Sequence, residues 1–251
     1  MIFANATDSH AHSLQTLNLL YEYDDFMASI RSMVDLGCGN GKDTEWWATR
    51  TTRDDDPEPL MIRCTGVDLG QDSPFRVKYP NLAYQSVDFE QDMLQFPGGY
   101  DVLWCHDAFQ YARSPLQTLA RWWHMASEGA MLYMCVPITQ RIHRRQFDYY
   151  LPSGSYYHYS LVNLIYMLAT TGWDCRSGFF RQSPGESWIH AAVYKSAQAP
   201  MDPKNTTWYH LEELNLIPES GKDSVLAHGH LNQQDLVLPW LDHSLMSMAI
   251  R

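Results

Sequence analysis

A glycine-rich segment, Asp35-Leu-Gly-Cys-Gly-Asn-Gly41, follows a short apolar run and precedes a stretch with helical periodicity. Glycine at every second position lets the backbone turn sharply and lets a ligand approach it, because no side chain stands in the way. The first turn of the helix that follows presents unpaired N–H groups and a partial positive charge. This order of elements indicates a turn at a sheet edge, which could be structural or could bind a nucleotide-like ligand.

The rest of the chain repeats the alternation of strand and helix. Five apolar runs are predicted to be strands, at residues 32–36, 61–67, 82–87, 100–105 and 131–136. Two more strand-like runs, 173–180 and 188–194, flank the turn-forming stretch 182–186 and predict an antiparallel hairpin. We therefore expect an α/β fold with a doubly wound, mostly parallel sheet of seven strands, which the antiparallel hairpin closes.

Helices are expected before, within and after this pattern. Apolar residues recur every three or four positions over residues 14–30, which predicts an N-terminal amphipathic helix. Further helical patterns include residues 46–48, 116–125 and 159–168. Because the sheet pattern ends near Lys195, the chain is predicted to consist of a domain over residues 1–195 and a C-terminal extension over residues 196–251 of unknown role. The extension is a candidate surface for homo-oligomer formation.

The net charge and the cysteine content limit the classes of partner and the cellular compartment that we expect. A formal charge of −11 disfavours a nucleic-acid partner, because a local basic patch would work against a repulsive overall field. The five cysteines include no C-x-x-C pair, which fits a reducing, cytoplasmic setting better than a disulfide framework. No stretch approaches the roughly 18 apolar residues of a membrane span, and the first residues lack a signal-peptide pattern. A soluble protein is expected.

Carboxylates follow two more of the predicted strands. Asp68 ends the second and Asp88 ends the third, so that with Asp35 three acids are expected at one sheet edge. A carboxylate at position 68 could accept hydrogen bonds from both hydroxyls of a ribose. Each acid alone could equally be a solvated loop residue or a helix cap. The three together favour a ligand site at the edge where open α/β sheets bind ligands.

On these motifs, D-x-G-C-G-x-G and an acid after each of the next two strands, the chain resembles the class I S-adenosylmethionine-dependent methyltransferases of the small-molecule type over residues 30–195. The resemblance implies a Rossmann-like methyltransferase fold and S-adenosylmethionine as cofactor. It places Asp35 near the amino group of the methionine moiety, Asp68 on the ribose and Asp88 near the adenine amine. The cofactor-binding residues it implies are Asp35, Gly37, Cys38, Gly39, Asn40, Gly41, Asp68, Leu69, Asp88, Phe89, Cys105 and His106. The family's Pro-Gly-Gly before the fifth strand is replaced by Ser127-Glu-Gly-Ala130.

Two histidines are candidate catalytic residues. His106 ends the fourth predicted strand and could act as a general base, or it could pack beside the cofactor. Its neighbour Asp107 could assist it or cap a helix. His158 lies in the segment Ser155-Tyr-Tyr-His-Tyr-Ser160, which in the resembled family often contributes to the acceptor pocket; a purely structural aromatic cluster is an equal alternative. The pairs His10/His12 and His228/His230 lack grouped acid or thiol partners, so no metal is expected.

Other nucleotide-dependent classes fit less well. A nicotinamide-binding G-x-G-x-x-G turn would need glycine at position 42, where the chain has Lys42, and no phosphate-cradling G-x-x-x-x-G-K-[ST] motif occurs. The predicted function is methylation of a small or medium-sized acceptor, at oxygen in preference to nitrogen. The alternatives are a non-catalytic S-adenosylmethionine-binding regulatory or scaffold protein, and a cleavage or aminopropyl-transfer reaction, which would share the adenosine-binding residues.

Overall fold

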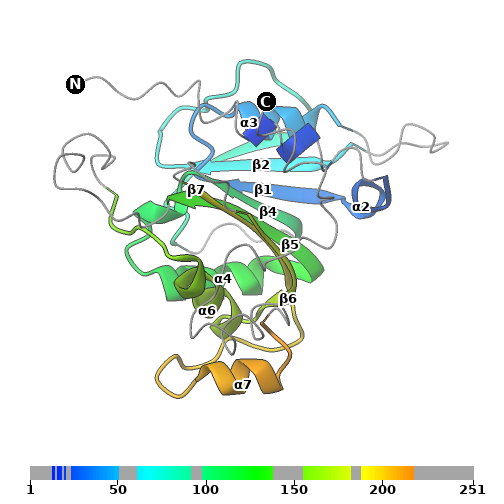
Figure 1. The fold of residues 1–251 in the computed structure, drawn as a ribbon. Coiled ribbons are helices and arrows are strands. Elements are labelled where there is room, and N and C mark those ends of the chain that lie inside the picture. Colours follow the sequence, from blue (N-terminus) through cyan, green and yellow to red (C-terminus); the bar gives the residue numbers. More distant parts are fainter. Residues whose placement is uncertain are drawn as a thin grey trace, which may run out of the picture.

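The structure is a computed structural model that describes residues 13–14, 16–18, 20, 24–50, 61–91, 98–137, 155–181 and 188–217. Within these ranges the centre of the molecule is a seven-stranded sheet with helices on both faces (Figure 1). Its strands are β1 (Ser32–Leu36), β2 (Arg63–Asp68), β3 (Leu82–Ser86), β4 (Tyr100–His106), β5 (Ala126–Pro137), β6 (Trp173–Arg181) and β7 (Trp188–Lys195). The predicted α/β fold is confirmed.

The strand order is β3-β2-β1-β4-β5-β7-β6. The first five strands along the chain pair in parallel, and β7 runs antiparallel to both β5 and β6. The chain leaves β1 on one side toward β2 and β3 and returns to its other side with β4. This reversal is the position at which the loops after β1 and β4 separate, and it is where doubly wound sheets bind ligands.

The described helices are α2 (Asp24–Ser29), α3 (Lys42–Ala48), the short η1 (Phe109–Tyr111), α4 (Pro115–Met125), α6 (Leu161–Thr170) and α7 (Trp208–Glu213). Of the helix predicted over residues 14–30, residues 14, 16–18 and 20 are helical and α2 follows, whereas residues 15, 19 and 21–23 lie outside the described residues. The helix predicted over 159–168 begins two residues later. The backbone N–H of Tyr159 instead donates to Pro137 O (2.9 Å), and Ser160 caps the helix by accepting from Asn163 N (3.2 Å).

Alternate side chains of the strands bury two separate cores. On β4, Leu103 and Cys105 point into the core under α4 and α6, whereas Val102 and Trp104 point into the core on the α3 side. On β5, Tyr133 shares the second core and stacks on Trp104 with ring centroids 3.9 Å apart. Apolar side chains on both faces are what a buried, mostly parallel sheet requires.

Strand β5 starts five residues before its predicted beginning. Ala126 pairs with Tyr100 directly after α4 ends, and the register then shifts before Met131. Of the intervening residues, Glu128 and Gly129 are exposed and Ala130 is buried, and Gly129 has a φ of 72°. The stretch 127–130, which replaces the expected Pro-Gly-Gly, is therefore an irregular part of the strand, which has no apolar run to reveal it.

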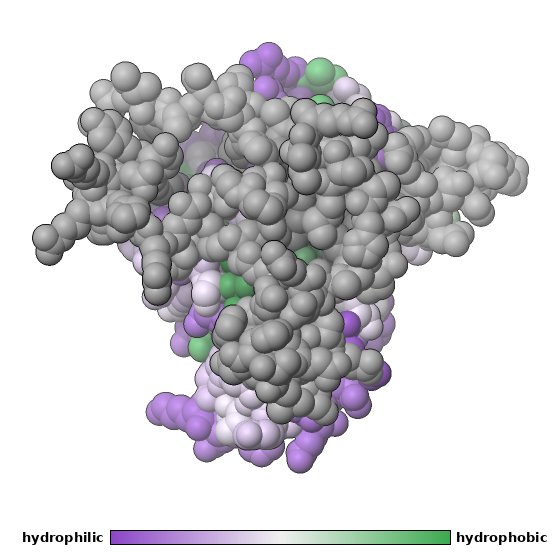
Figure 2. Space-filling view, viewed as in Figure 1, coloured by the Kyte–Doolittle hydropathy of each residue, from purple (hydrophilic) through white to green (hydrophobic). Residues whose placement is uncertain are grey.

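The described part of the C-terminal extension, residues 196–217, packs on the first core. Leu211 on α7 is fully buried there, and the backbone N–H of Cys175 on β6 donates to Leu216 O (2.9 Å). The described surface over α7 is hydrophilic to intermediate in hydropathy (Figure 2). Residues 218–251 lie outside the described residues. Among the helices of the described ranges, none combines the length and the hydropathy needed to cross a membrane.

Candidate functional site

The glycine-rich turn connects β1 to α3 at the point where the strand order reverses. The backbone N–H groups of Gly37 and Cys38 both donate to Val67 O, at 2.8 and 2.9 Å, so the turn is fixed against β2. Gly37 has a φ of 82°, and a Cβ atom on it would lie 2.4 Å from the Cβ of Ala108. Gly39 has a φ of 52°, but a Cβ there would meet nothing within 4 Å. The turn is therefore packed on one side and open to a ligand at Gly39.

Asp68 faces this turn from the end of β2. One carboxylate oxygen accepts from the N–H of Gly39 (2.8 Å) and the other from the N–H of Leu69 (2.7 Å). Because each carboxylate oxygen has two lone pairs, both can accept a further hydrogen bond. The side chain of Leu69 is 72% exposed beside them. A carboxylate next to an exposed apolar side chain suits a group with two hydroxyls joined to a flat ring.

Two more acids lie beneath the turn. Asp35 on β1 is 2% exposed and accepts from the hydroxyl of Thr44 (2.6 Å). Burial raises the pKa of Asp35 well above its usual range, the charges of Asp43 and Asp68 raise it further, and the Thr44 hydrogen bond opposes them. Asp43 accepts from the hydroxyl of Ser13 (2.6 Å) and from the indole of Trp104 (3.0 Å). This part of the site concentrates negative charge, which a bound ammonium group would stabilise.

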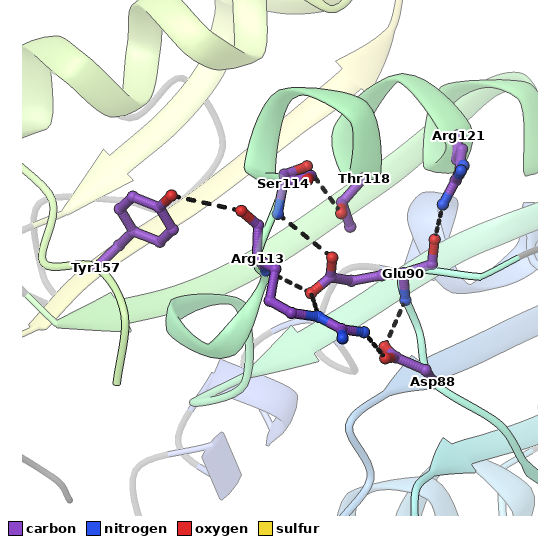
Figure 3. Close-up of polar contacts among 7 residues, drawn as sticks. All are labelled: Asp88, Glu90, Arg113, Ser114, Thr118, Arg121 and Tyr157. Carbon is purple, nitrogen blue, oxygen red and sulfur yellow. Dashed lines mark hydrogen bonds and ion pairs between the residues drawn. The ribbon is translucent and has the colours of Figure 1, made fainter. Parts of the chain in front are cut away.

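Asp88 follows β3 and lies in an ion pair (Figure 3). Its carboxylate accepts from the guanidinium of Arg113 at 2.6 Å and from the N–H of Glu90 at 3.0 Å. Glu90, only 8% exposed, accepts in turn from the backbone N–H groups of Arg113 and Ser114, which directly precede α4. Its own carbonyl oxygen accepts from the guanidinium of Arg121 on α4. The carboxylates after β3 therefore also hold the start of α4 in place.

The residue after β4 has an unusual backbone conformation. Asp107 has a φ of 56°, in the left-handed region that non-glycine residues seldom adopt, and its N–H donates to Cys135 O (3.0 Å). Burial raises the pKa of its carboxyl to about 6, although a hydrogen bond from Gln110 lowers it. Left-handed backbone of this kind is concentrated at functional sites. A carboxyl that titrates near neutral pH can exchange a proton with a bound ligand.

His106 ends β4 in a row of polar side chains that crosses three strands. It pairs in register with Cys135 on β5, and Cys135 pairs with His190 on β7. The Nδ1 atom of His190 lies 2.8 Å from the hydroxyl of Tyr133, and its Nε2 lies 4.0 Å from the sulfur of Cys135. The His106 and His190 rings are 6.5 Å apart between centroids. We call these residues, His106, Cys135, His190 and Tyr133, the imidazole row.

The other predicted site residues have mainly structural contacts. Asn40 accepts from the N–H of Lys42 (3.2 Å) at the start of α3, and Phe89 packs edge-on against Trp122 with centroids 5.9 Å apart. Burial and the neighbouring acids raise the pKa of the Cys38 thiol, which disfavours a reactive thiolate. The side chain of Cys105 is fully buried in the core under α4, so it could contact a ligand at the edge only through its backbone.

His158 lies apart from the imidazole row, on the α4 and α6 side of the sheet, where it lines a groove. Within the described ranges, no group of three His, Cys, Asp or Glu side chains is placed to hold a metal ion. The pairs His10/His12 and His228/His230 lie outside those ranges.

The site residues predicted from the sequence do not include Asp43, Glu90, Tyr133 or His190. Asp43 carried a weak signal, since it is an acid in the first turn of the helix after the glycine-rich segment. His190 and Tyr133 carried none, because their contact depends on the antiparallel register of β5 and β7, which no local pattern reveals.

Comparisons with known proteins agree with this arrangement. Residues 34–134 match the family model described as a methyltransferase domain. A search of curated proteins finds no match to the chain. Among solved structures, a Listeria monocytogenes protein assigned as an S-adenosylmethionine-dependent methyltransferase superposes with a TM-score of 0.52 at 16% identity, covering 72% of this chain and 99% of that one.

Two further structures have the same fold. An S-adenosylmethionine-dependent methyltransferase from Mesorhizobium loti has a TM-score of 0.50 at 13% identity, over 70% of this chain and 98% of that one. Phosphoethanolamine N-methyltransferase 2 from Haemonchus contortus, solved with S-adenosyl-L-methionine, has a TM-score of 0.55 at 13% identity, over 72% of this chain and 52% of that one. At these identities the structures establish the fold. The family match, for its part, describes residues 34–134 as a methyltransferase domain.

Proposed function

We propose that this protein binds S-adenosylmethionine at the glycine-rich turn and transfers its methyl group to a small or medium-sized acceptor, at oxygen in preference to nitrogen. The observation that carries the proposal is the open approach to Gly39. The Asp68 carboxylate borders it, and the buried Asp35 lies on β1 just before the turn. A cofactor with a ribose diol, an ammonium group and a sulfonium centre matches an open turn with acids on two sides.

Each residue of the site would bind a different part of the cofactor. Asp68 would accept from the ribose hydroxyls with its remaining lone pairs, and Leu69 would pack on the adenine. Asp35, through its charge, would stabilise the ammonium group of the methionine moiety. Asp88 would accept from the adenine amine only with the lone pairs that Arg113 and Glu90 leave, because its carboxylate already binds both. When bound, the cofactor supplies an electrophilic methyl group for direct displacement.

Oxygen methylation is favoured by the groups at the end of β4. A hydroxyl nucleophile must lose its proton, and a nearby base of suitable pKa accelerates that step. His106 and Asp107 are adjacent there, and the pKa of Asp107 is raised to about 6, so its carboxylate is ionised at neutral pH. His106 remains our candidate general base and Asp107 a candidate assistant. His158 remains a candidate acceptor-side residue.

Calorimetric titration tests the cofactor assignment. We expect S-adenosylmethionine and S-adenosylhomocysteine to bind and NAD not to bind. Asp68→Asn, which keeps the shape of the side chain, should weaken S-adenosylhomocysteine binding about tenfold or more. One acceptor oxygen becomes an NH2 group, which can accept neither from the ribose nor from the backbone N–H of Gly39 or Leu69. Asp72→Asn is the matched control, since Asp72 is an exposed acid on the same loop and should leave the affinity unchanged. Equal affinities for Asp68→Asn and the wild type in folded protein would reject the assignment.

The pH dependence of binding tests Asp35. Its raised pKa means that this carboxyl retains a proton to higher pH than usual, and only the ionised form attracts an ammonium group. Affinity for S-adenosylhomocysteine should therefore rise as pH rises through that pKa, with release of a proton. Calorimetry in buffers of different ionisation enthalpy measures the proton directly. An affinity independent of pH, with no proton released, would contradict this role.

The scaffold alternative makes a different prediction for the same protein. It would retain cofactor affinity but yield no methylated product with hydroxyl- or amine-bearing acceptors. A product screen by mass, run once binding is established, separates the two.

A further inference from the structure

The side chain of Gln110 is buried just after the end of β4, and the proposed function gives it no role. Gln110 is the central residue of η1 and follows Asp107 by three positions. In such a tight helical turn, side chains three residues apart lie on the same side, so the amide can reach back to Asp107. Gln110 is 0% exposed, although glutamine is mostly found on protein surfaces. A buried amide needs hydrogen-bond partners inside the protein.

The amide of Gln110 contacts Asp107 twice. Its Nε2 atom donates to the carboxylate Oδ1 of Asp107 and to the backbone carbonyl oxygen of the same residue (3.1 Å). These two contacts hold the carboxyl group in one orientation relative to a backbone with the left-handed φ of 56°. Because Nε2 can only donate, it is matched to the ionised form of the carboxyl group.

The oxygen of the same amide gains nothing from this arrangement. Oε1 of Gln110 is buried and, within the described part of the chain, has no hydrogen-bond partner. A buried acceptor without a donor is unfavourable, so this position of the amide costs stability. An apolar side chain of similar shape would avoid that cost. The contact with Asp107 is therefore what the amide adds at this position.

The backbone around Gln110 is held independently of its side chain. The carbonyl oxygen of Gln110 accepts from the N–H groups of Tyr156 (2.9 Å) and Tyr157 (3.3 Å). The N–H of Tyr111 donates to Ala108 O (3.0 Å), which closes η1. A substitution that changes only the side chain should therefore leave the turn after β4 in place.

The ionisable groups next to Asp107 lie on β4 and β5. His106 and Cys105 precede it, and the charge of Asp107 helps to raise the pKa of the Cys105 thiol. Cys135 on β5 accepts the N–H of Asp107 at its carbonyl oxygen. Burial raises the pKa of Asp107 to about 6, and the hydrogen bond from Gln110 opposes that effect. Since a hydrogen bond to the ionised form favours that form, removal of the amide should raise the pKa further.

We propose that Gln110 is a positioning residue of the methyl-transfer site, and that its amide holds the carboxylate of Asp107 in one orientation at the end of β4. The inference rests on the proposed function, in which Asp107 assists His106 when the acceptor loses its proton. Gln110 is buried and acts through Asp107, not on the acceptor itself. A carboxylate that is already oriented does not have to be ordered when the acceptor binds.

The pKa of Asp107 provides the first test. Gln110→Met removes the amide and keeps the length of the side chain. Gln117→Met, at an exposed position on α4, is the matched control. Carbon NMR titration of the aspartate carboxyl groups measures the pKa, and the Asp107 signal is assigned by its loss in Asp107→Asn. We expect Gln110→Met to raise the pKa by about one pH unit or more, the effect of one charge-assisted hydrogen bond, and Gln117→Met to leave it unchanged.

Stability at two pH values separates positioning from a structural role. The ionised carboxyl group of Asp107 needs the amide, whereas the protonated one can do without it. Gln110→Met should therefore lower the folding equilibrium constant about tenfold more at pH 8 than at pH 4.5. In the Asp107→Asn background this difference should vanish. A side chain that only fills space would cause the same loss at both pH values. If the methionine variant does not fold, Gln110→Leu, which also lacks the amide, replaces it.

Turnover connects the contact to the reaction. With an acceptor from the product screen, the pH of half-maximal rate should rise in Gln110→Met by about as much as the pKa of Asp107. Three results would overturn the inference: an unchanged pKa of Asp107 in the folded variant, an equal loss of stability at both pH values, and a rate profile that does not shift. Absence of S-adenosylhomocysteine binding, or of methylated product, in the wild type would instead reject the proposed function. The pKa and stability measurements need neither cofactor nor acceptor, so the two failures are distinguishable.

Discussion

The two halves of the sheet edge present different chemistry. The half after β1, β2 and β3 offers acids and glycine backbone, with Asp35 and Asp68 around the turn at Gly39. The half after β4, with β5 and β7 beside it, offers His106 and His190 from the imidazole row. The first half has a fixed shape and a negative charge, which suits holding a cation-bearing cofactor. The second has imidazole side chains and, in Asp107, a carboxyl whose pKa is raised to about 6 by burial.

Rigidity of the first half can be tested at its glycines. Gly37→Ala should lower the free energy of unfolding by about 2 to 4 kcal/mol, because it combines a left-handed φ with a Cβ only 2.4 Å from Ala108. Gly39→Ala has a similar φ but an open position, so we expect a loss of only about 1 kcal/mol. Urea denaturation measures both. Equal losses would show that backbone conformation alone, and not packing against Ala108, makes the turn rigid.

Proton exchange in the second half can be tested at Asp107. The folded chain holds a proton on this carboxyl up to about pH 6, whereas an unfolded chain releases it near pH 4. The folded state therefore binds the extra proton between these values, and the free energy of unfolding contributed by Asp107 falls as pH rises from about 4 to 6, by about 2 kcal/mol.

Asp107→Asn should remove this contribution to the pH dependence of the free energy of unfolding and leave the contributions of the other groups unchanged. Denaturant melts of both proteins at pH 4.5 and pH 7, compared as a difference, isolate it. If the slopes of the two proteins match, the carboxyl titrates normally and is a poor candidate for catalysis.

The smallest expected effect is within the imidazole row. Tyr133→Phe leaves Nδ1 of His190 without the hydroxyl at 2.8 Å, and we expect a loss of about 1 kcal/mol in the free energy of unfolding. The nitrogen chemical shifts of His190 should also change, since the hydroxyl helps to fix its tautomer. Tyr194→Phe on β7 is the control for loss of a phenol. A change in stability without any change in the His190 signals would mean that Tyr133 acts only by packing.

Local patterns determine much of this fold and of the first half of the sheet edge, after β1, β2 and β3. The strand predicted at residues 32–36 has those bounds, because an uninterrupted buried run ends directly at the glycine-rich turn. Asp68 faces Gly39 because Asp68 ends β2, Gly39 follows β1, and neighbouring parallel strands end at one edge of the sheet. A motif that lies within one segment is readable in the sequence.

Other contacts of the site join segments that are distant in the sequence. The register of β7 against β5 places His190 beside Cys135, although 55 residues separate them. Asp88 and Arg113, 25 residues apart, meet only because α4 begins beside the end of β3. Neither pairing is marked by spacing or by residue type. The predicted boundary at residue 195 follows the end of the sheet, and the burial of Leu211 shows that the chain after it still contributes to the core.

The outermost strand, β6, has consequences for how copies of the chain could associate. Edge strands with unpaired N–H groups invite another strand to extend the sheet. Here the N–H of Cys175 donates to Leu216, and those of Arg176 and Ser177 donate to the side chain of Asp174 at 2.7 and 3.3 Å. These three groups cannot template an added strand. A strand added at residues 175–177 would first have to displace these hydrogen bonds.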